Sequence, residues 1–107
     1  MLGSSPVVSS AHRADVDRYA GMVDLASGDA RRAADRFRAA VALVEPPEKL
    51  ETVPDIHSCL LGVSLARLGR LADARPLLDK PCARYASHGI PDPLIVEWIS
   101  DARRQAR

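Results

Sequence analysis

Residues 18–37, RYAGMVDLASGDARRAADRF, and residues 59–78, CLLGVSLARLGRLADARPLL, carry the pattern that decides the fold of this chain. Each stretch holds two glycines seven residues apart. They are Gly21 and Gly28 in the first stretch and Gly62 and Gly69 in the second. The second pair follows the first at an offset of 41 residues, which is 62 minus 21. A fixed offset of this length is typical of a repeated supersecondary unit.

The residues around the glycines align at the same offset. Phe37 matches Leu78, so a large apolar residue stands at the same place in both units. Ala40 falls on Pro81 and is the one poor match. Because glycine lets two helices approach closely while a large side chain fills the space beside it, each unit is predicted to be a pair of packed helices.

Apolar residues recur at three- and four-residue spacing in five segments, which predicts five helices. The segments span about residues 11–27, 29–44, 55–68, 71–87 and 92–105. Asp29 and Asp92 are expected to cap the second and fifth helices. The buried stripe of the first helix is expected to contain Val16, Tyr19, Ala20, Val23 and Ala26. No segment of four or more residues alternates as a strand would, so the predicted fold class is all-α.

A chain of 107 residues is long enough for one compact domain and too short for two. Residues 1–10, with one glycine, one proline and four serines, are predicted to form a flexible N-terminal tail. Residues 11–107 are predicted to form the helical repeat domain. Three prolines in residues 45–54 predict a loop between the two helix pairs.

Composition excludes several kinds of partner. The formal net charge is only +1, which provides no strong field for nucleic acid. No run approaches the ~20 apolar residues needed to span a bilayer, and the first residues do not resemble a signal peptide. A cytoplasmic protein is therefore expected, with Cys59 and Cys82 as reduced, buried thiols.

Both units resemble the tetratricopeptide repeat, in particular its extended variety of about 40 residues found in kinesin light chains and bacterial signalling proteins. The matching residues are Gly21, Gly28, Ala33, Phe37 and Ala40 in the first unit and Gly62, Gly69, Ala74 and Leu78 in the second. Trp98 and Ala102 resemble the first helix of a third unit. The resemblance covers about residues 14–106. It implies antiparallel helical hairpins stacked as a short right-handed solenoid, with two repeats and a C-terminal capping helix.

In this family the first helices of successive repeats line a concave face that binds a partner peptide or helix. Carried onto this chain, the resemblance implies a partner-binding face made of Arg18, Tyr19, Met22, Leu25, Cys59, Leu60, Val63 and Arg67. This groove would be mainly apolar, with an arginine toward each end. The implied function is a protein-interaction module with a scaffold or regulatory role in bacterial signalling, without catalysis and without a cofactor.

Two alternatives stay open. A helical stack this short could self-associate, with the groove filled by a second copy of the chain. Alternatively, a hairpin over residues 55–87 would bring together His57, Cys59, Cys82 and His88, four side chains of the kind that bind zinc. Their spacing matches no standard zinc motif, and no phosphate loop or nucleophile motif predicts an enzyme.

Overall fold

The computed structural model of the chain describes residues 10–44 and 55–107. Within these ranges the chain is all-helical and no residue lies in a strand. The helices are α1 (Ser10–Ala26), α2 (Ala30–Val44), α3 (Asp55–Arg67), α4 (Leu71–Ser87) and α5 (Pro93–Gln105). The predicted all-α class is confirmed, and each predicted helix end lies within one residue of the observed one. The proline-containing loop and the predicted tail lie outside the described residues, except that Ser10 begins α1.

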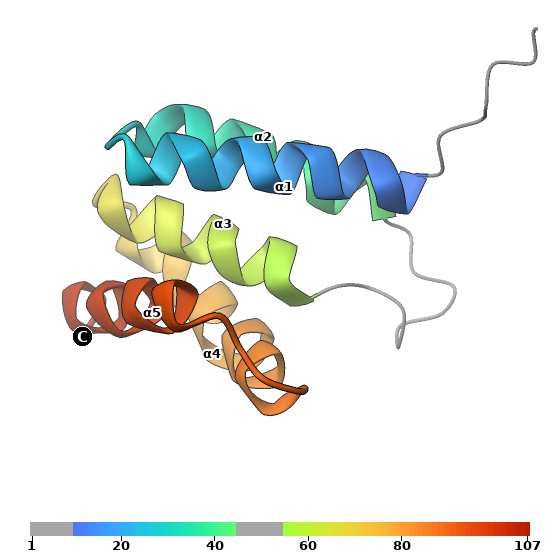
Figure 1. Cartoon of the computed structure of the whole chain (residues 1–107). Coiled ribbons are helices and arrows are strands. Elements are labelled where there is room, and N and C mark those ends of the chain that lie inside the picture. Colours follow the sequence, from blue (N-terminus) through green and yellow to red (C-terminus); the bar gives the residue numbers. More distant parts are fainter. Residues whose placement is uncertain (1–9, 45–54) are drawn as a thin grey trace, which may run out of the picture.

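The helices form two hairpins and a closing helix (Figure 1). α1 packs on α2, and α3 packs on α4. The hairpins meet mainly where α2 contacts α3, and α5 packs on α3 and α4. The third helix therefore has neighbours from every other part of the described fold, which places it at the centre of the core.

The turns of the two hairpins are the same structure, 41 residues apart. Gly28 and Gly69 both adopt left-handed backbone conformations, with φ of 91° and 79°. The Gly28 amide donates to the Leu25 carbonyl at 3.1 Å, and the Gly69 amide donates to the Ala66 carbonyl at 3.0 Å. In both turns the following amide donates to the carbonyl five residues before it. This pattern ends each helix with a glycine that can take a positive φ without a Cβ penalty.

The other glycine of each pair permits close contact between the two helices of its hairpin. A Cβ on Gly21 would lie 2.6 Å from the Phe37 ring, and a Cβ on Gly62 would lie 2.8 Å from the Leu77 Cβ. It would also lie 3.2 Å from the backbone nitrogen of Leu78, the residue that aligns with Phe37. In both hairpins, therefore, a glycine in the first helix lets the second helix approach closely.

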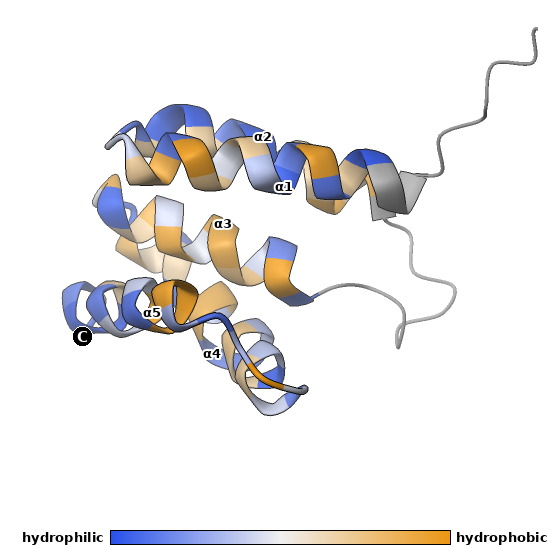
Figure 2. Ribbon diagram, viewed as in Figure 1, coloured by the Kyte–Doolittle hydropathy of each residue, from blue (hydrophilic) through white to orange (hydrophobic). Residues whose placement is uncertain are grey.

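Small side chains fill much of the core. Of the nineteen buried hydrophobic residues in the described part, eight are alanines. They are Ala14, Ala33, Ala34, Ala40, Ala66, Ala74, Ala102 and Ala106. Phe37 is the largest fully buried side chain. In Figure 2 the apolar residues concentrate where the helices face one another, while the outer sides of α2 and α5 are largely hydrophilic.

The fifth helix closes the fold as the sequence predicts. The Asp92 side chain accepts a hydrogen bond from the Leu94 amide at 2.9 Å, and Pro93 is the first helical residue. Ile95, Trp98 and Ile99 of this helix belong to the main hydrophobic cluster. Together with Ala102 and Ala106 they form the apolar side that covers the second hairpin.

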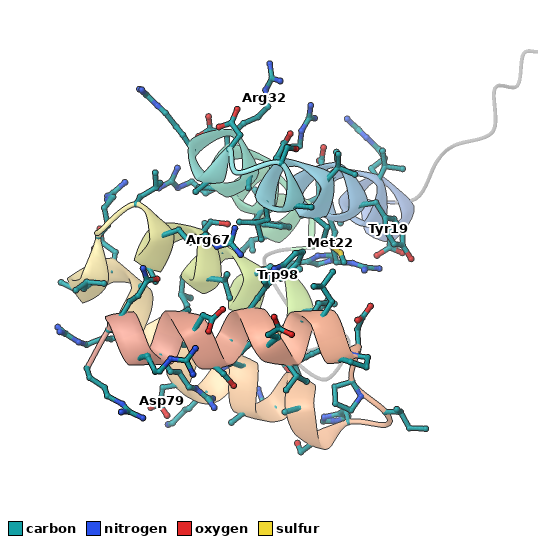
Figure 3. All side chains as sticks on the ribbon, turned by 60° about the vertical axis from the view of Figure 1, so that its left-hand side comes forward. Tyr19, Met22, Arg32, Arg67, Asp79 and Trp98 are labelled. Atoms are coloured by element: carbon teal, nitrogen blue, oxygen red, sulfur yellow. A yellow bond between two sulfur atoms is a disulfide. The ribbon has the colours of Figure 1, made fainter. Side chains whose placement is uncertain are left out.

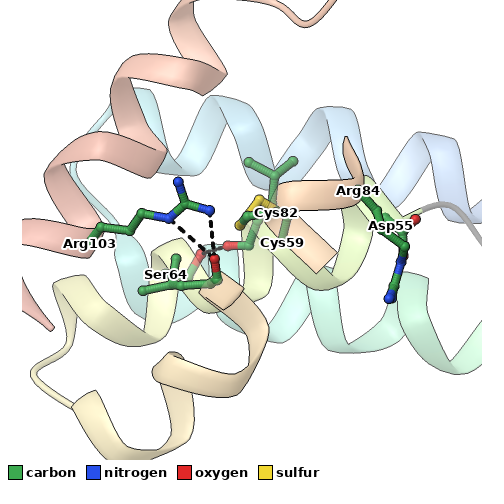
Figure 4. The surroundings of a disulfide bond; sticks show 8 residues. Asp55, Cys59, Ser64, Cys82, Arg84 and Arg103 are labelled. Atoms are coloured by element: carbon green, nitrogen blue, oxygen red, sulfur yellow. Dashed lines mark hydrogen bonds and ion pairs between the residues drawn. A yellow bond between two sulfur atoms is a disulfide. The ribbon is translucent and has the colours of Figure 1, made fainter. Parts of the chain in front are cut away.

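The prediction of two reduced thiols is wrong, because Cys59 and Cys82 form a disulfide bond (Figure 4). Residue 59 lies near the start of α3 and residue 82 near the end of α4, and the antiparallel hairpin places them opposite each other. An ion pair between Asp55 and Arg84, at 2.9 Å, joins the same ends of the two helices. Disulfides persist mainly in oxidising compartments. Reduced cysteines therefore no longer provide an argument for the expected cytoplasmic location.

Candidate functional site

The eight residues predicted to line a concave groove divide into two groups. Leu25, Cys59, Leu60 and Val63 are buried, with at most 2% of any side chain exposed. Arg18, Met22 and Arg67 are half-buried, and Tyr19 is 59% exposed. Only the second group presents surface to a partner.

The buried group belongs to the core because α5 packs on α3. Leu60 and Val63 lie in one hydrophobic cluster with Ile95 and Trp98 of α5, and Met22 packs against this cluster. Cys59 is held by its disulfide to α4. The predicted apolar floor is therefore covered by the protein itself.

What remains accessible is a face made of Arg18, Tyr19, Met22 and Arg67, with the largely buried Trp98 ring beneath Arg67, and we call these five residues the groove face. Figure 3 shows Tyr19, Met22, Arg67 and Trp98 in the region between α1 and α5, while Arg32 points away from it on the outer side of α2. The elements that position these residues are α1 and α3, the first helices of the two hairpins, and the closing helix α5.

Arg18 is held by three neighbours on its own helix. Its guanidinium carbon lies 4.3 Å from the centre of the Tyr19 ring. One terminal nitrogen lies 3.4 Å from the Asp15 carboxylate, and the other lies 4.0 Å from the Met22 sulfur. Asp15 and Met22 lie three and four residues from Arg18 and therefore share its helix face, whereas Tyr19 is its direct neighbour in sequence.

Arg67 links the hairpins at the other end of the groove face. Its Nη1 donates to the Leu25 carbonyl, at the end of α1, at 2.9 Å. Its guanidinium carbon lies 5.6 Å from the centre of the Trp98 ring. Burial lowers the pKa of Arg67 from its usual value. A shallow open pocket next to this side chain is lined by Arg67, Asp101, Ala102, Arg104 and Gln105.

A buried histidine lies behind the groove face. His57 is fully buried, and neither ring nitrogen has a hydrogen-bond partner among the described residues. Its Nε2 lies 3.9 Å from the Asp15 carboxylate, which is too long for a hydrogen bond. Burial is the main cause that lowers the pKa of His57, and the Arg18 charge lowers it further, whereas Asp15 and Asp17 act in the opposite direction. Burial and the Arg18 charge therefore both favour the neutral imidazole.

The four side chains of the suggested zinc set do not come together as ligands. Cys59 and Cys82 are bonded to each other and offer no thiolate. His88 is exposed, with its Nδ1 2.9 Å from the Arg84 carbonyl oxygen. Within the described ranges no group of three His, Cys, Asp or Glu residues is placed to hold a metal ion.

The sequence assigned the wrong side of α1 to the core. The buried stripe contains Ala14, Gly21 and Leu25, whereas Val16, Tyr19 and Val23 are 56%, 59% and 66% exposed. Both stripes are apolar and have helical spacing, so periodicity does not distinguish them. The glycine at position 21, which packs against Phe37, was the signal that marks the buried side.

No family model, curated protein or solved structure matches the chain. In the described residues, no helix combines the length and apolar character that a membrane crossing requires.

Proposed function

We propose that this protein is a protein-interaction module: two tetratricopeptide-like hairpins and the capping helix α5 form a short right-handed solenoid whose groove face binds a helix or peptide of another protein. The hairpin turns that repeat at 41 residues support a stacked-repeat arrangement. A surface that uses one helix from each unit is the kind of binding site that such stacks provide. A scaffold or regulatory role in bacterial signalling is the corresponding biological role.

One observation carries the proposal: arginine, aromatic and methionine side chains gather on the groove face. Arg18 stacks on Tyr19, Arg67 lies over Trp98, and Met22 lies on the same face. The tyrosine, arginines and methionine, which are exposed or half-buried, are of residue types enriched in protein interfaces, whereas the Trp98 ring supports Arg67 from the core. Each arginine is also oriented by a second contact, to Asp15 or to the Leu25 carbonyl. Orientation before binding reduces the entropy lost when a partner docks.

The chemistry of the groove face indicates the kind of partner. A guanidinium group stands toward each end, and the apolar surface of Met22 and Tyr19 lies near one of them. Arg67 uses Nη1 for the Leu25 carbonyl, which leaves its other N–H groups for an acceptor. An amphipathic helix with an apolar anchor and a carboxylate at either end fits this pattern, because arginine binds carboxylates with paired hydrogen bonds.

Selection from a peptide library tests the proposal and requires no identified partner. A displayed library of helical peptides is selected on the immobilised protein, and the affinity of enriched peptides is measured by fluorescence anisotropy. We expect acidic amphipathic sequences whose affinity falls at least tenfold on the double variant Met22→Glu/Arg67→Glu. Arg32→Glu is the matched control, since it also replaces an arginine with an acid but on the outer side of α2.

Circular dichroism of each variant checks that the fold is retained. Equal affinity of the enriched peptides for the wild type and the groove variant would show that the groove face is not the binding site. Leu60, although part of the predicted groove, is unsuitable for this test because it is fully buried and its substitution would disturb the core.

A further inference from the structure

The buried side-chain polar atoms that have no hydrogen-bond partner gather at one place in the described part of the chain. They are the two ring nitrogens of His57 and the Nε of Arg18. His57 lies near the start of α3, and Arg18 lies in the middle of α1. Because native proteins leave few such atoms unpaired, a group of them in one cluster requires a specific explanation.

One carboxylate oxygen lies close to both of these side chains. The Nη2 of Arg18 is 3.4 Å from the Oδ1 of Asp15, and the Nε2 of His57 is 3.9 Å from the same oxygen. The distance to the histidine exceeds that of a hydrogen bond by less than about 1 Å. A small movement of the Asp15 carboxylate would therefore transfer it from the arginine on α1 to the histidine on α3.

While the imidazole is neutral, Asp15 stays with Arg18. A neutral ring offers the carboxylate no charge, whereas the guanidinium always carries one. In this arrangement the Arg18 side chain is only 15% exposed, against 48% for that of Asp15. The contact with Asp15 thus orients Arg18 and also keeps most of its side chain against the protein.

Protonation of His57 would place two cations at one carboxylate. The charged groups that act on His57 in the described part of the chain are Arg18, Asp15 and Asp17, all of them on α1. At the same end of α3, Asp55 is already paired with Arg84 of α4 at 2.9 Å. The buried imidazolium cannot reach water, whereas the long arginine side chain can turn outward. Repulsion between the two cations is therefore relieved by movement of the arginine.

We propose that His57 is a proton-controlled switch of the groove face: its protonated ring takes the Asp15 carboxylate from Arg18, and the released guanidinium binds an acidic partner more tightly. This inference rests on the proposed function of the groove face. Asp15 orients Arg18, but it also occupies the group that a partner carboxylate would bind, so release removes a competitor. The protonated cluster also carries one more positive charge behind the groove face, which attracts an acidic partner.

NMR spectroscopy of the free protein tests the exchange of partners without any peptide. The His57 ring is followed from about pH 7.5 to about pH 5 and should titrate with a midpoint below the usual histidine pKa of about 6.5. Nuclear Overhauser effects between Arg18 and Met22 should weaken with the same midpoint as the arginine turns outward. Because Arg18 opposes protonation and Asp15 favours it, Arg18→Gln should raise the midpoint and Asp15→Asn should lower it. Contacts of Arg18 that persist while His57 titrates overturn the proposal, and so does a ring that stays neutral over this range.

Peptide affinity tests the regulatory role. Acidic peptides selected on the groove face should bind about threefold or more tightly at about pH 5.5 than at about pH 7.5, and His57→Gln should abolish this difference. His88→Gln is the matched control, since it makes the same substitution at an exposed histidine and should respond to pH like the wild type. Asp15→Asn, at a half-exposed position, should bind tightly at both pH values.

The outcomes separate this inference from the proposed function. An equal response to pH in the wild type and in His57→Gln overturns the regulation by His57 and leaves binding by the groove face intact. If no peptide binds at either pH, the proposed function fails and the regulatory role fails with it, whereas the NMR measurement still decides whether Asp15 changes partner.

Discussion

Reduction of the Cys59–Cys82 disulfide should lower the stability of the fold by an amount that can be worked out from its position. The bond joins residues 23 apart in sequence and closes a loop that contains the whole turn between α3 and α4. In the chain-entropy model a loop of this length contributes about 3.4 kcal/mol to stability by restricting the unfolded chain. Because domains of this size are stable by only about 5–15 kcal/mol, this is a large share of the total.

The assay is thermal unfolding followed by circular dichroism at 222 nm, with and without a phosphine reductant. A loss of about 3.4 kcal/mol corresponds to a fall in Tm of roughly 15 °C for a chain of this length. Both sulfurs are fully buried, so reduction is carried out in denaturant before refolding and verified by mass spectrometry. The variant Cys59→Ala/Cys82→Ala is the control, since its Tm should not respond to the reductant.

Two results would refute the reasoning. If the reduced protein, verified by mass, melts within about 3 °C of the oxidised protein, the loop does not restrict the unfolded chain as argued. If the unreduced protein in denaturant shows two free thiols, the bond itself is absent under those conditions.

Three further predictions concern the core and the buried histidine. Phe37→Ala should cost about 3–5 kcal/mol in urea unfolding, because the ring is fully buried against Gly21, and an unchanged unfolding midpoint would contradict its place in the core. Gly62→Ala should destabilise by about 1–3 kcal/mol, since the new Cβ would lie 2.8 Å from the Leu77 Cβ; stabilisation by the better helix former would show that the hairpin is loosely packed. Because folding lowers the pKa of His57, the unfolded chain binds a proton at this residue more readily than the folded protein does. The contribution of neutral His57 to the free energy of unfolding is therefore fully present above about pH 6.5 and is lost as pH falls. His57→Leu should therefore show a flatter dependence of unfolding free energy on pH between about 7.5 and 5 than the wild type, and parallel curves would exclude this role.

The sequence was sufficient to predict the five helices and the glycines at the two hairpin turns. Gly28 and Gly69 stop their helices because only glycine takes the left-handed conformation cheaply, and this signal is local. Asp92 and Pro93 mark the start of α5 for the same reason, since cap and first-turn preferences act within a few residues. Helix ends could therefore be located without reference to tertiary contacts.

The candidate site was predicted only in part, because burial depends on which helix covers which side. Leu60 and Val63 were correctly assigned to α3, but their burial follows from α5 packing on that helix, which periodicity does not reveal. The covalent pairing of Cys59 with Cys82 was also missed, although the antiparallel hairpin was expected to bring these residues together. The resemblance to tetratricopeptide repeats and the binding role remain predictions.

A core built largely from alanine has a consequence for the tolerance of the protein to substitution. At most of these positions there are few atoms to remove, so truncation is mild, whereas a larger residue must displace the atoms packed around it. A saturation-mutagenesis profile of this domain should therefore be asymmetric, with enlargement penalised more often than loss of volume. Variation during evolution would be confined in the same way, and the alanine positions should change more slowly than the few large residues that have room to exchange for one another.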